Sequence, residues 1–367
     1  MALFPLSRRA LMGAAVSTGI LPSRLLAQAA RPILAGTYAQ EGGTGLVRLE
    51  ASTRGWTAAR APASIRNASF GVRSDATGLR YLVDEQAQGA LGIYSRDLKQ
   101  VETRPTLGAD PCHVALSADG RRLAVANYSS GSIALWQLDA KTGLPLGEAQ
   151  RVVHQGSGPD RARQAGAHAH WVGFAARDSV LHSVDLGADA IFAHRLAPGS
   201  GEVAETTIAY RAQAGSGPRH LARHPRLPIA FLVAELANTV TILRTQADGT
   251  FQARGIVSTL PKGFQGASAA AHIAINRAGN RLYVSNRGHN SIAVFAIAGD
   301  GGLARLQHVD CGGNWPRMFL LLEGRGEMLV ANQRSGDVAC LRIGSDGRLG
   351  AAATPNVRVP GVAYLTL

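Results

Sequence analysis

Residues 113–138 read HVALSADGRRLAVANYSSGSIALWQL, and this stretch contains the pattern that decides the fold. Three short apolar segments are separated by two polar turns, and the second segment ends at the amide residue Asn127. Short apolar runs bounded by Gly, Ser, Asn and Asp predict antiparallel β-strands. The same frame returns at residues 272–297, where the second segment ends at Asn286. The repeat, rather than any single segment, therefore carries the fold prediction.

Moving this frame along the chain gives six second-strand ends that carry a polar residue. They are Glu85, Asn127, Asp185, Glu235, Asn286 and Asn332. A degenerate earlier copy begins at Ile33, which makes seven units, and units of roughly 40 to 50 residues with several short strands are typical of β-propellers. We expect an all-β, seven-bladed propeller in which the tail, 357–367, completes the first blade and closes the ring. Two stacked β-sandwiches are the alternative, but they do not explain seven repeats.

Composition narrows the classes of partner. With 46% hydrophobic and 17% charged residues among 367, the chain can bury a large core, and 43 glycines favour turns over long helices. The net charge of +13 comes from scattered arginines without a dense basic run, so we expect anionic small molecules and no nucleic acid as partners. Three cysteines without C-x-x-C spacing argue against a disulfide framework or structural zinc, although one bridge stays possible.

The N-terminus has the pattern of an export signal. Arg8 and Arg9 precede an apolar stretch, and Ala27-Gln28-Ala29 forms a small-residue cleavage site. This pattern is typical of twin-arginine signals, so we expect a signal at 1–29, a propeller domain at 30–367, recognition by the twin-arginine machinery, and a periplasmic or secreted protein. A short membrane anchor is the alternative, but glycine, proline and arginine make the stretch a poor span. After cleavage we expect no stable span and a monomer.

The repeat also places candidate site residues. In a propeller the first strand of each blade lines the channel and the second returns beside it, so the start of one and the end of the other share a mouth. Counting back 15 or 16 residues from each strand end gives the strand-start positions Ser69, Cys112, His170, Arg219, Ala271 and Arg317. His170, Arg219 and Arg317 should therefore meet Glu85, Asp185 and Glu235, with Arg287 one residue beyond Asn286. An imidazole, carboxylates and guanidiniums at one opening suit an anionic substrate and a general base.

Each of these residues also has a structural interpretation. Strand-end Asn and Asp often bond nearby backbone N–H groups, and for Asn127, Asn332 and Asp185 we favour this capping role. By a period of two, His168 shares a face with His170 and could support it. The same period puts three histidines on the opposite, buried face: His113, His220 and His272. Arg219 and Arg287 could be salt-bridge partners of Glu235 and Glu85.

Several of these segments together resemble the β-propeller lactonase family, which includes bacterial propeller-type 6-phosphogluconolactonases and fungal carboxymuconate lactonizing enzymes. The matching segments, spread over nearly all of the chain after the signal, are Asp110–His113 with Asn127–Gly131, His168–His170 with Asp185–Asp189, Gly215–Leu221 with Glu235-Leu236, Tyr283–Gly288, and Trp315–Arg317 with Ala331–Gln333. The resemblance implies seven blades and a catalytic set matching His170, Arg219, Glu235 and Arg287. The chain departs from the family at His272, where relatives often carry an acidic residue, and in its export signal.

The leading functional hypothesis is hydrolysis of a sugar-derived or carboxylated lactone, without metal or cofactor. Glu235 or His170 would be the general base, and Arg219 and Arg287 would bind the substrate's anion and the developing oxyanion. Arg317, His168, Glu85 and Asp185 would contribute to substrate binding. Export argues against a phosphorylated, cytoplasmic lactone as the natural substrate.

Other mechanisms and functions have weaker support. Gly156-Ser157-Gly158 lacks the G-x-S-x-G pattern of a nucleophilic serine and is interpreted as a loop. His168 and His170 lack a recognisable third metal ligand in the sequence. A lactonizing cycloisomerase of the muconate type would need a second cationic pocket, for which Arg317 is the candidate. A non-catalytic propeller that binds a ligand or partner is the alternative from another class.

Overall fold

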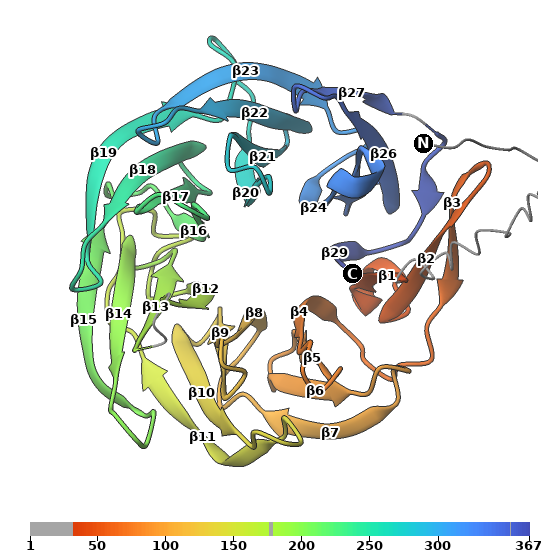
Figure 1. Ribbon diagram of the computed structural model, residues 1–367. Coiled ribbons are helices and arrows are strands. Elements are labelled where there is room, and N and C mark those ends of the chain that lie inside the picture. Colours follow the sequence, from red (N-terminus) through yellow and green to blue (C-terminus); the bar gives the residue numbers. More distant parts are fainter. Residues whose placement is uncertain (1–31, 176–178, 353) are drawn as a thin grey trace, which may run out of the picture. The chain divides into compact units, whose positions relative to one another are not determined.

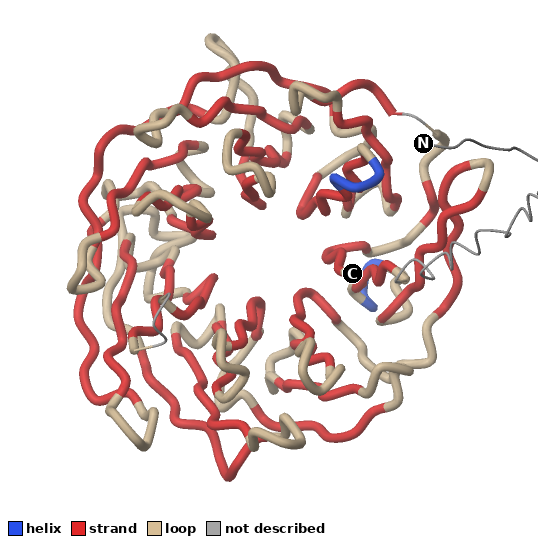
Figure 2. Tube along the Cα trace, viewed as in Figure 1, coloured by secondary structure: helices blue, strands red, loops and turns tan. Residues whose placement is uncertain are grey.

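The computed structural model describes residues 32–175, 179–352 and 354–367, and the predicted export signal lies outside this range. Residues Pro32–Leu367 form one compact unit. Its seven antiparallel sheets are arranged around a central channel, as Figure 1 shows by element and Figure 2 by secondary structure. Two short 3-10 helices, η1 (Ala39–Glu41) and η2 (Glu323–Arg325), are the helical elements of the described chain. The all-β, seven-bladed prediction is confirmed.

The strands follow the chain from blade to blade, with the innermost strand named first. Blade 1 contains β29 (Val362–Thr366), β1 (Ile33–Thr37), β2 (Leu46–Ser52) and β3 (Gly55–Arg60). Blade 2 contains β4 (Ala68–Arg73), β5 (Arg80–Asp84), β6 (Ala90–Tyr94) and β7 (Gln100–Pro105). Blade 3 contains β8 (Pro111–Leu116), β9 (Arg122–Asn127), β10 (Ser132–Leu138) and β11 (Pro145–Val153). Blade 4 contains β12 (Ala169–Phe174), β13 (Val180–Asp185), β14 (Ala190–Leu196) and β15 (Val203–Arg211).

The remaining three blades repeat this order. Blade 5 contains β16 (Pro218–Arg223), β17 (Ile229–Ala234), β18 (Thr239–Thr245) and β19 (Phe251–Ser258). Blade 6 contains β20 (Ala269–Ile275), β21 (Arg281–Arg287), β22 (Ser291–Ile297) and β23 (Leu303–Asp310). Blade 7 contains β24 (Pro316–Leu322), β25 (Glu327–Asn332), β26 (Asp337–Ile343) and β27 (Leu349–Ala352), and the short β28 (Val357–Arg358) pairs with β26.

The C-terminal strand closes the ring. Strand β29 pairs antiparallel with β1, so the last strand of the chain is the innermost strand of the first blade (Figure 1). The expectation that all of 357–367 enters blade 1 is wrong for β28, which stays in blade 7. Gly361, at φ 67°, lies in the turn between these segments and allows the chain to change direction there.

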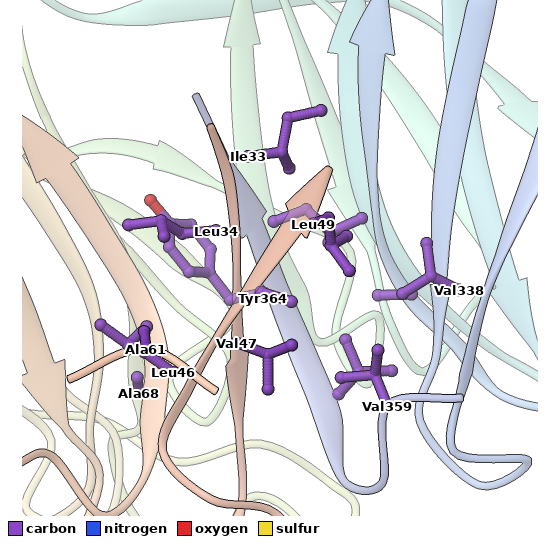
Figure 3. Packing of buried hydrophobic residues seen from close by; sticks show 14 of the residues in the cluster. Ile33, Leu34, Leu46, Val47, Leu49, Ala61, Ala68, Val338, Val359 and Tyr364 are labelled. Atoms are coloured by element: carbon purple, nitrogen blue, oxygen red, sulfur yellow. The ribbon is translucent and has the colours of Figure 1, made fainter. Parts of the chain in front are cut away.

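The apolar core lies between neighbouring blades. Five clusters each join two adjacent blades, and a sixth packs blade 1 against blades 7 and 2. Figure 3 shows this sixth cluster: Leu34 of blade 1 lies beside Tyr364 of the closing strand, and Leu49 lies toward Val338 of blade 7 on the other side. Each blade thus covers its neighbour's apolar face, which explains why the sequence repeats once per blade.

Hydrogen bonds between blades add a second, polar link. Alternate blades use a side chain of their second strand to donate to the carbonyl of a left-handed glycine in the outer turn of the next blade. These donors and acceptors are Tyr81 Oη with Gly143 at 2.7 Å, His182 Nε2 with Gly249 at 2.7 Å, and Tyr283 Oη with Gly347 at 2.8 Å. The three cysteines, Cys112, Cys311 and Cys340, are buried and free, so the disulfide that the sequence left possible is not formed. Within the described ranges, no helix is long and apolar enough to cross a membrane.

Candidate active site

The strand pairing confirms that innermost-strand starts and second-strand ends meet at one mouth. Pro111 pairs with Asn127, Ala169 with Asp185, and Pro316 with Asn332. This equivalence defines a ring of strand-end residues that occupy the same position in successive blades.

Asparagines in this strand-end ring cap the fold. Each is fully buried and donates from Nδ2 to the carbonyl at the end of a preceding outer strand: Asn127 to Thr106 at 3.0 Å, Asn286 to Thr259 at 2.9 Å, and Asn332 to Cys311 at 3.2 Å. The amide thus ties the innermost and outermost parts of the sheets together. A structural role for Asn127 and Asn332 is thus observed, but the predicted contacts to nearby backbone N–H groups are not: the amides donate to distant carbonyls, and their Oδ1 atoms have no partner among the described residues.

Asp185 is also a cap and is not placed to bind substrate. Its fully buried carboxylate accepts hydrogen bonds from the backbone N–H groups of His168 at 2.7 Å and Ala188 at 2.8 Å, and it pairs with His154 Nδ1 at 2.7 Å. Because these contacts occupy both carboxylate oxygens, neither oxygen is available to a substrate. The structure therefore favours the capping interpretation over the substrate contact expected for Asp185.

The charged and aromatic residues of the candidate site lie one position beyond the strand-end ring. Pairing shows that Asp84 and Ala234, rather than Glu85 and Glu235, are equivalent to Asn127. Placing Glu85 and Glu235 in the same ring as Asn127 was thus wrong by one residue. A second ring, directly beyond the caps, contains Glu85, Tyr128, Glu235 and Arg287.

Glu235 is the centre of a buried ion-pair cluster. Its Oε1 accepts a hydrogen bond from Arg163 Nη2 at 2.7 Å, and its Oε2 lies 2.7 Å from Arg287 Nη2 and 3.2 Å from Arg219 Nε. The contact with Arg219 is an ion pair without hydrogen-bond geometry. The carboxylate is 3% exposed, so three guanidiniums converge on a single anion away from bulk water. The structure thus brings together three of the four residues expected to be catalytic, Glu235, Arg219 and Arg287.

Electrostatics make Glu235 a weak base. Burial alone would raise the pKa of this carboxyl, but the charges of Arg287 and Arg219 outweigh burial and hold the pKa well below its usual range. Burial and the nearby Arg287 lower the pKa of Arg219 to about 9, so its guanidinium stays charged at neutral pH. Glu235 is therefore arranged to hold arginines rather than to accept a proton.

Arg163 was missed by the sequence reasoning. It lies in the long loop 154–168 between β11 and β12, the stretch in which Gly156-Ser157-Gly158 was interpreted as a loop, as observed. Its Nη2 also donates to Tyr128 Oη at 3.3 Å, and its side chain is 39% exposed, so it faces the opening. The length of this loop is the feature of the sequence that could have indicated Arg163, because long loops on a rigid scaffold often carry functional residues.

A β-bulge in every innermost strand explains how the strand-start residues reach the channel. The pairing register shifts at Ser69, Cys112, His170, Arg219, Ala271-His272, Arg317 and Ala363. The six predicted strand-start positions all lie at these bulges, and Ala363 of the closing strand is the seventh. Bulges re-aim side chains and are frequent beside active sites.

The bulge also overturns one expectation from the period of two. His113, His220 and His272 were expected on the face away from His170, but their rings lie together with it. The His220 centroid is 5.4 Å from those of His113 and His170 and 5.7 Å from that of His272, and these four residues come from four blades. Phe70 of blade 2 joins them, 4.1 Å from His113. These rings fill the channel below the mouth, and burial lowers the pKa of each histidine, so they are neutral.

His170 belongs to this layer through His220 and also contacts Tyr128 at the mouth. Its Nδ1 lies 3.6 Å from Cys112 Sγ, and no hydrogen bond from a described residue engages Nε2. Burial and the charge of Arg219 lower the pKa of His170 well below its usual range, opposed by the charge of Glu235. The imidazole is therefore neutral and close enough to Glu235 for each group to shift the other's pKa. Burial also raises the pKa of the Cys112 thiol, which stays protonated.

His168 and Tyr128 form one wall of the opening. The His168 ring stacks on Tyr128 at 4.6 Å, and its Nδ1 lies 3.1 Å from the Tyr128 carbonyl oxygen. The His170 ring meets the same tyrosine edge-on at 5.3 Å. His168 therefore supports the mouth through Tyr128, which the sequence analysis did not single out.

Arg317 and Glu85 form a second, separate pair. Arg317 Nη2 lies 3.8 Å from Glu85 Oε2, and Tyr38 Oη donates to the same oxygen at 2.7 Å. The Arg317 guanidinium also lies 5.3 Å from the centre of the Tyr38 ring. Among the carboxylates of the described residues, Arg219 and Arg287 pair with Glu235, and the expected pairing with Glu85 belongs to Arg317.

Trp315 borders the cluster on the blade 7 side. Its ring centre lies 5.5 Å from the Arg287 guanidinium and 3.3 Å from that of Arg334. A bulky residue at φ 68° is unusual, and its N–H donates to Asn290 Oδ1 at 2.9 Å. Such backbone strain is frequent where a side chain must be held for function. No three His, Cys, Asp or Glu side chains among the described residues are grouped to hold a metal ion.

Comparison with known proteins agrees with this architecture. The family described as "Lactonase, 7-bladed beta-propeller" matches residues 32–365. The chain belongs to this lactonase family. The 6-phosphogluconolactonase of Bacillus subtilis (strain 168) is 30% identical over 315 residues, which cover 83% of this chain and 88% of the relative.

Solved structures give the same result. A protein from Lactobacillus plantarum has a TM-score of 0.83 at 28% identity and covers 91% of this chain and 98% of its own. The periplasmic gluconolactonase of Pseudomonas aeruginosa has a TM-score of 0.82 at 27% identity, with the same coverage. Lactonase family membership and these relatives support lactone hydrolysis as the activity.

The Glu235 cluster predicts unequal effects of two substitutions on stability. In this lactonase, Glu235→Gln would leave buried Arg219 and Arg287 without their counter-charge, which should lower the free energy of unfolding by about 3 to 5 kcal/mol. Arg163→Gln removes an exposed partner and should cost less than about 1 kcal/mol. Urea denaturation of both variants and the wild type tests this. Equal costs would contradict the assignment of Glu235 as the buried centre.

Proposed function

We propose that the protein hydrolyses a sugar-derived, gluconolactone-type lactone at this mouth, without metal, with His170 as general base. The observation that carries this proposal is the neutral His170 imidazole beside three guanidiniums that converge on Glu235. A proton acceptor next to preorganised positive charge is the combination that ester hydrolysis needs.

The choice of base follows from the contacts. Both Glu235 oxygens are engaged by guanidiniums, so neither is free to accept a proton from an attacking water. His170 Nε2 has no hydrogen-bond partner among the described residues, and the imidazole is neutral. Of the two bases that the sequence left open, the structure thus favours His170, and Glu235 becomes a positioning residue.

Positive charge at the opening suits the developing oxyanion. Arg163, Arg219 and Arg287 share the single counter-charge of Glu235, while Arg317 is matched by Glu85. Two positive charges in these groups are therefore uncompensated. Arg163, as the exposed member, and Arg287 beside Trp315 are the groups best placed to meet a carbonyl oxygen that becomes negative.

The reaction proceeds in two steps. His170 Nε2 takes a proton from water while the water oxygen attacks the lactone carbonyl carbon, and the resulting oxyanion is held by the arginines. The tetrahedral intermediate then expels the ring oxygen, and the imidazolium returns the proton to that leaving oxygen. The product is an open hydroxy acid, and the enzyme recovers a neutral His170.

The relatives support the substrate class. One is a 6-phosphogluconolactonase and another a periplasmic gluconolactonase, so both act on gluconic acid lactones by name. Stacking surfaces at Trp315 and Tyr128 are suitable for the C–H faces of a sugar ring. The cycloisomerase alternative needs Arg317 as a second carboxylate site, but the charge of that guanidinium is already balanced by Glu85, 3.8 Å away.

We also propose export through the twin-arginine pathway. The paired Arg8 and Arg9, the apolar stretch and the Ala27-Gln28-Ala29 site support this, and one relative is itself named as periplasmic. An exported enzyme meets unphosphorylated sugar lactones, which agrees with a gluconolactone-type substrate.

Activity should depend on His170 and not on a histidine at the far end of the channel. With gluconolactone, 6-phosphogluconolactone and a muconolactone as substrates, His170→Asn should lower kcat/KM by roughly 10² to 10⁴ for the preferred one, the contribution of a positioned base. His224 follows the opposite end of β16, so His224→Asn is the matched control and should retain activity. Wild-type rates equal to spontaneous hydrolysis across the panel would favour a binding protein instead.

The lowered pKa of His170 predicts the pH dependence. A base works when deprotonated, and a pKa below the ordinary value near 6.5 keeps the imidazole deprotonated as the pH falls. The profile of kcat/KM should therefore stay flat through the range around pH 6.5, in which an ordinary histidine titrates, and decline only at lower pH. An inflection near pH 6.5 that disappears in His170→Asn would show that this imidazole titrates normally, contrary to its burial.

Export can be measured independently of activity. Replacing Arg8 and Arg9 together by lysine should retain the protein in the cytoplasm and leave the leader uncleaved, as seen by cell fractionation and intact mass. The wild type should be found outside the cytoplasm with the leader removed near Ala29. Unchanged fractionation of the double variant would refute the twin-arginine route.

A further inference from the structure

A small cavity lies in the channel beside the bulges, behind the ion-pair cluster. Six of its lining residues occupy bulge positions in six different blades: Ser69, Cys112, Arg219, His272, Arg317 and Ala363. Phe70, His220 and Met318 complete the lining. Its volume of about 10 Å³ for the centre of a water-sized particle leaves room for one such particle.

Hydrogen-bond donors around this cavity lack acceptors. Ser69 is 4% exposed, and its hydroxyl has no hydrogen-bond partner among the described residues. His272 Nδ1, on the wall of the cavity, is likewise buried without a hydrogen-bond partner among those residues. Arg317, which stays partly accessible to solvent, makes a 3.8 Å ion pair to Glu85 but no hydrogen bond within the described chain. Arg219 donates from Nη1 to the Ala271 carbonyl at 2.8 Å and its Nε faces Glu235 at 3.2 Å, so the remaining N–H groups of its guanidinium are the ones available to the cavity. Buried donors normally have a hydrogen-bond partner, because a buried donor without one costs free energy.

The charge of the residues around the cavity determines which ion or molecule it can hold. Two guanidiniums line the cavity, no carboxylate does, and the two ion-pair groups of the channel carry two uncompensated positive charges. A cation would be repelled, while a water molecule would leave the charge unbalanced and bring two hydrogens among groups that mostly donate. A carboxylate or phosphate exceeds the available volume. A single-atom anion satisfies the charge, the donors and the size.

We propose that this cavity is a halide site, occupied by chloride, that neutralises part of the positive charge behind the mouth. The hydroxyl of Ser69 and the guanidiniums of Arg219 and Arg317 donate to the ion. The bound halide then fixes two bulge arginines from different blades, Arg219 of blade 5 and Arg317 of blade 7, and so braces the channel. The inference requires no catalytic activity and is independent of the proposed reaction.

Thermal unfolding at constant sodium concentration tests this directly. Because a ligand stabilises the state that binds it, chloride or bromide at about 0.3 M should raise Tm by about 2 °C or more over methanesulfonate, and the rise should saturate. Ser69→Ala should weaken or remove this difference, and Ser200→Ala, in an exposed turn, should keep it. Equal Tm values in chloride and methanesulfonate for the wild type would overturn the proposal.

A crystal of the wild-type protein grown in sodium bromide gives an answer that does not depend on any variant folding. We expect an anomalous peak within hydrogen-bond distance of Ser69 Oγ and the Arg317 guanidinium. Density of a water molecule only, with no anomalous signal, would overturn the halide assignment. So would displacement of the bromide by added gluconate, since the cavity would then belong to the substrate's own anionic group.

Discussion

The buried carboxylate of Glu235 is the constraint on which the mouth depends. It holds Arg163 from a long loop, Arg219 from a bulge of blade 5 and Arg287 from the end of β21 in blade 6, at 2.7 to 3.2 Å. A single buried anion thereby fixes side chains from separate parts of the chain, and its low pKa keeps that anion charged. The same contacts occupy both oxygens of Glu235, and for this reason we propose His170 rather than Glu235 as the proton acceptor.

The propeller separates structural and chemical residues by one position. The strand-end ring of Asn127, Asn286 and Asn332 caps the sheets, and the next residue in each blade is free to differ: Tyr128, Arg287 and Gln333. At the starts of the innermost strands the bulge re-aims side chains, and in blades 2, 5 and 7 two successive residues line the cavity in the channel. The repeat supplies the scaffold, and these adjacent positions supply the residues of the candidate site.

Much of the fold and part of the candidate site could be predicted from the sequence, because the sequence repeats once for each blade that packs on its neighbour. The fold, the closing strand and the meeting of Glu235 with Arg219 and Arg287 all follow from it. The bulges could not be predicted, because a bulge breaks the period of two by which His113, His220 and His272 were assigned to the wrong face. Arg163 was missed because its loop lies outside the repeat, and Asp185 was misplaced because a cap and a ligand look alike in sequence.

The most direct test of this account is a crystal structure of the protein with gluconate, the open product, bound. We predict that its carboxylate lies at the mouth, with one oxygen near His170 Nε2 and the other within hydrogen-bond distance of Arg163 or Arg287, and its carbon chain beside Trp315 or Tyr128. Gluconate bound at the opposite end of the channel, or at the mouth but away from His170, would contradict the claim that Glu235 and its arginines build the catalytic site.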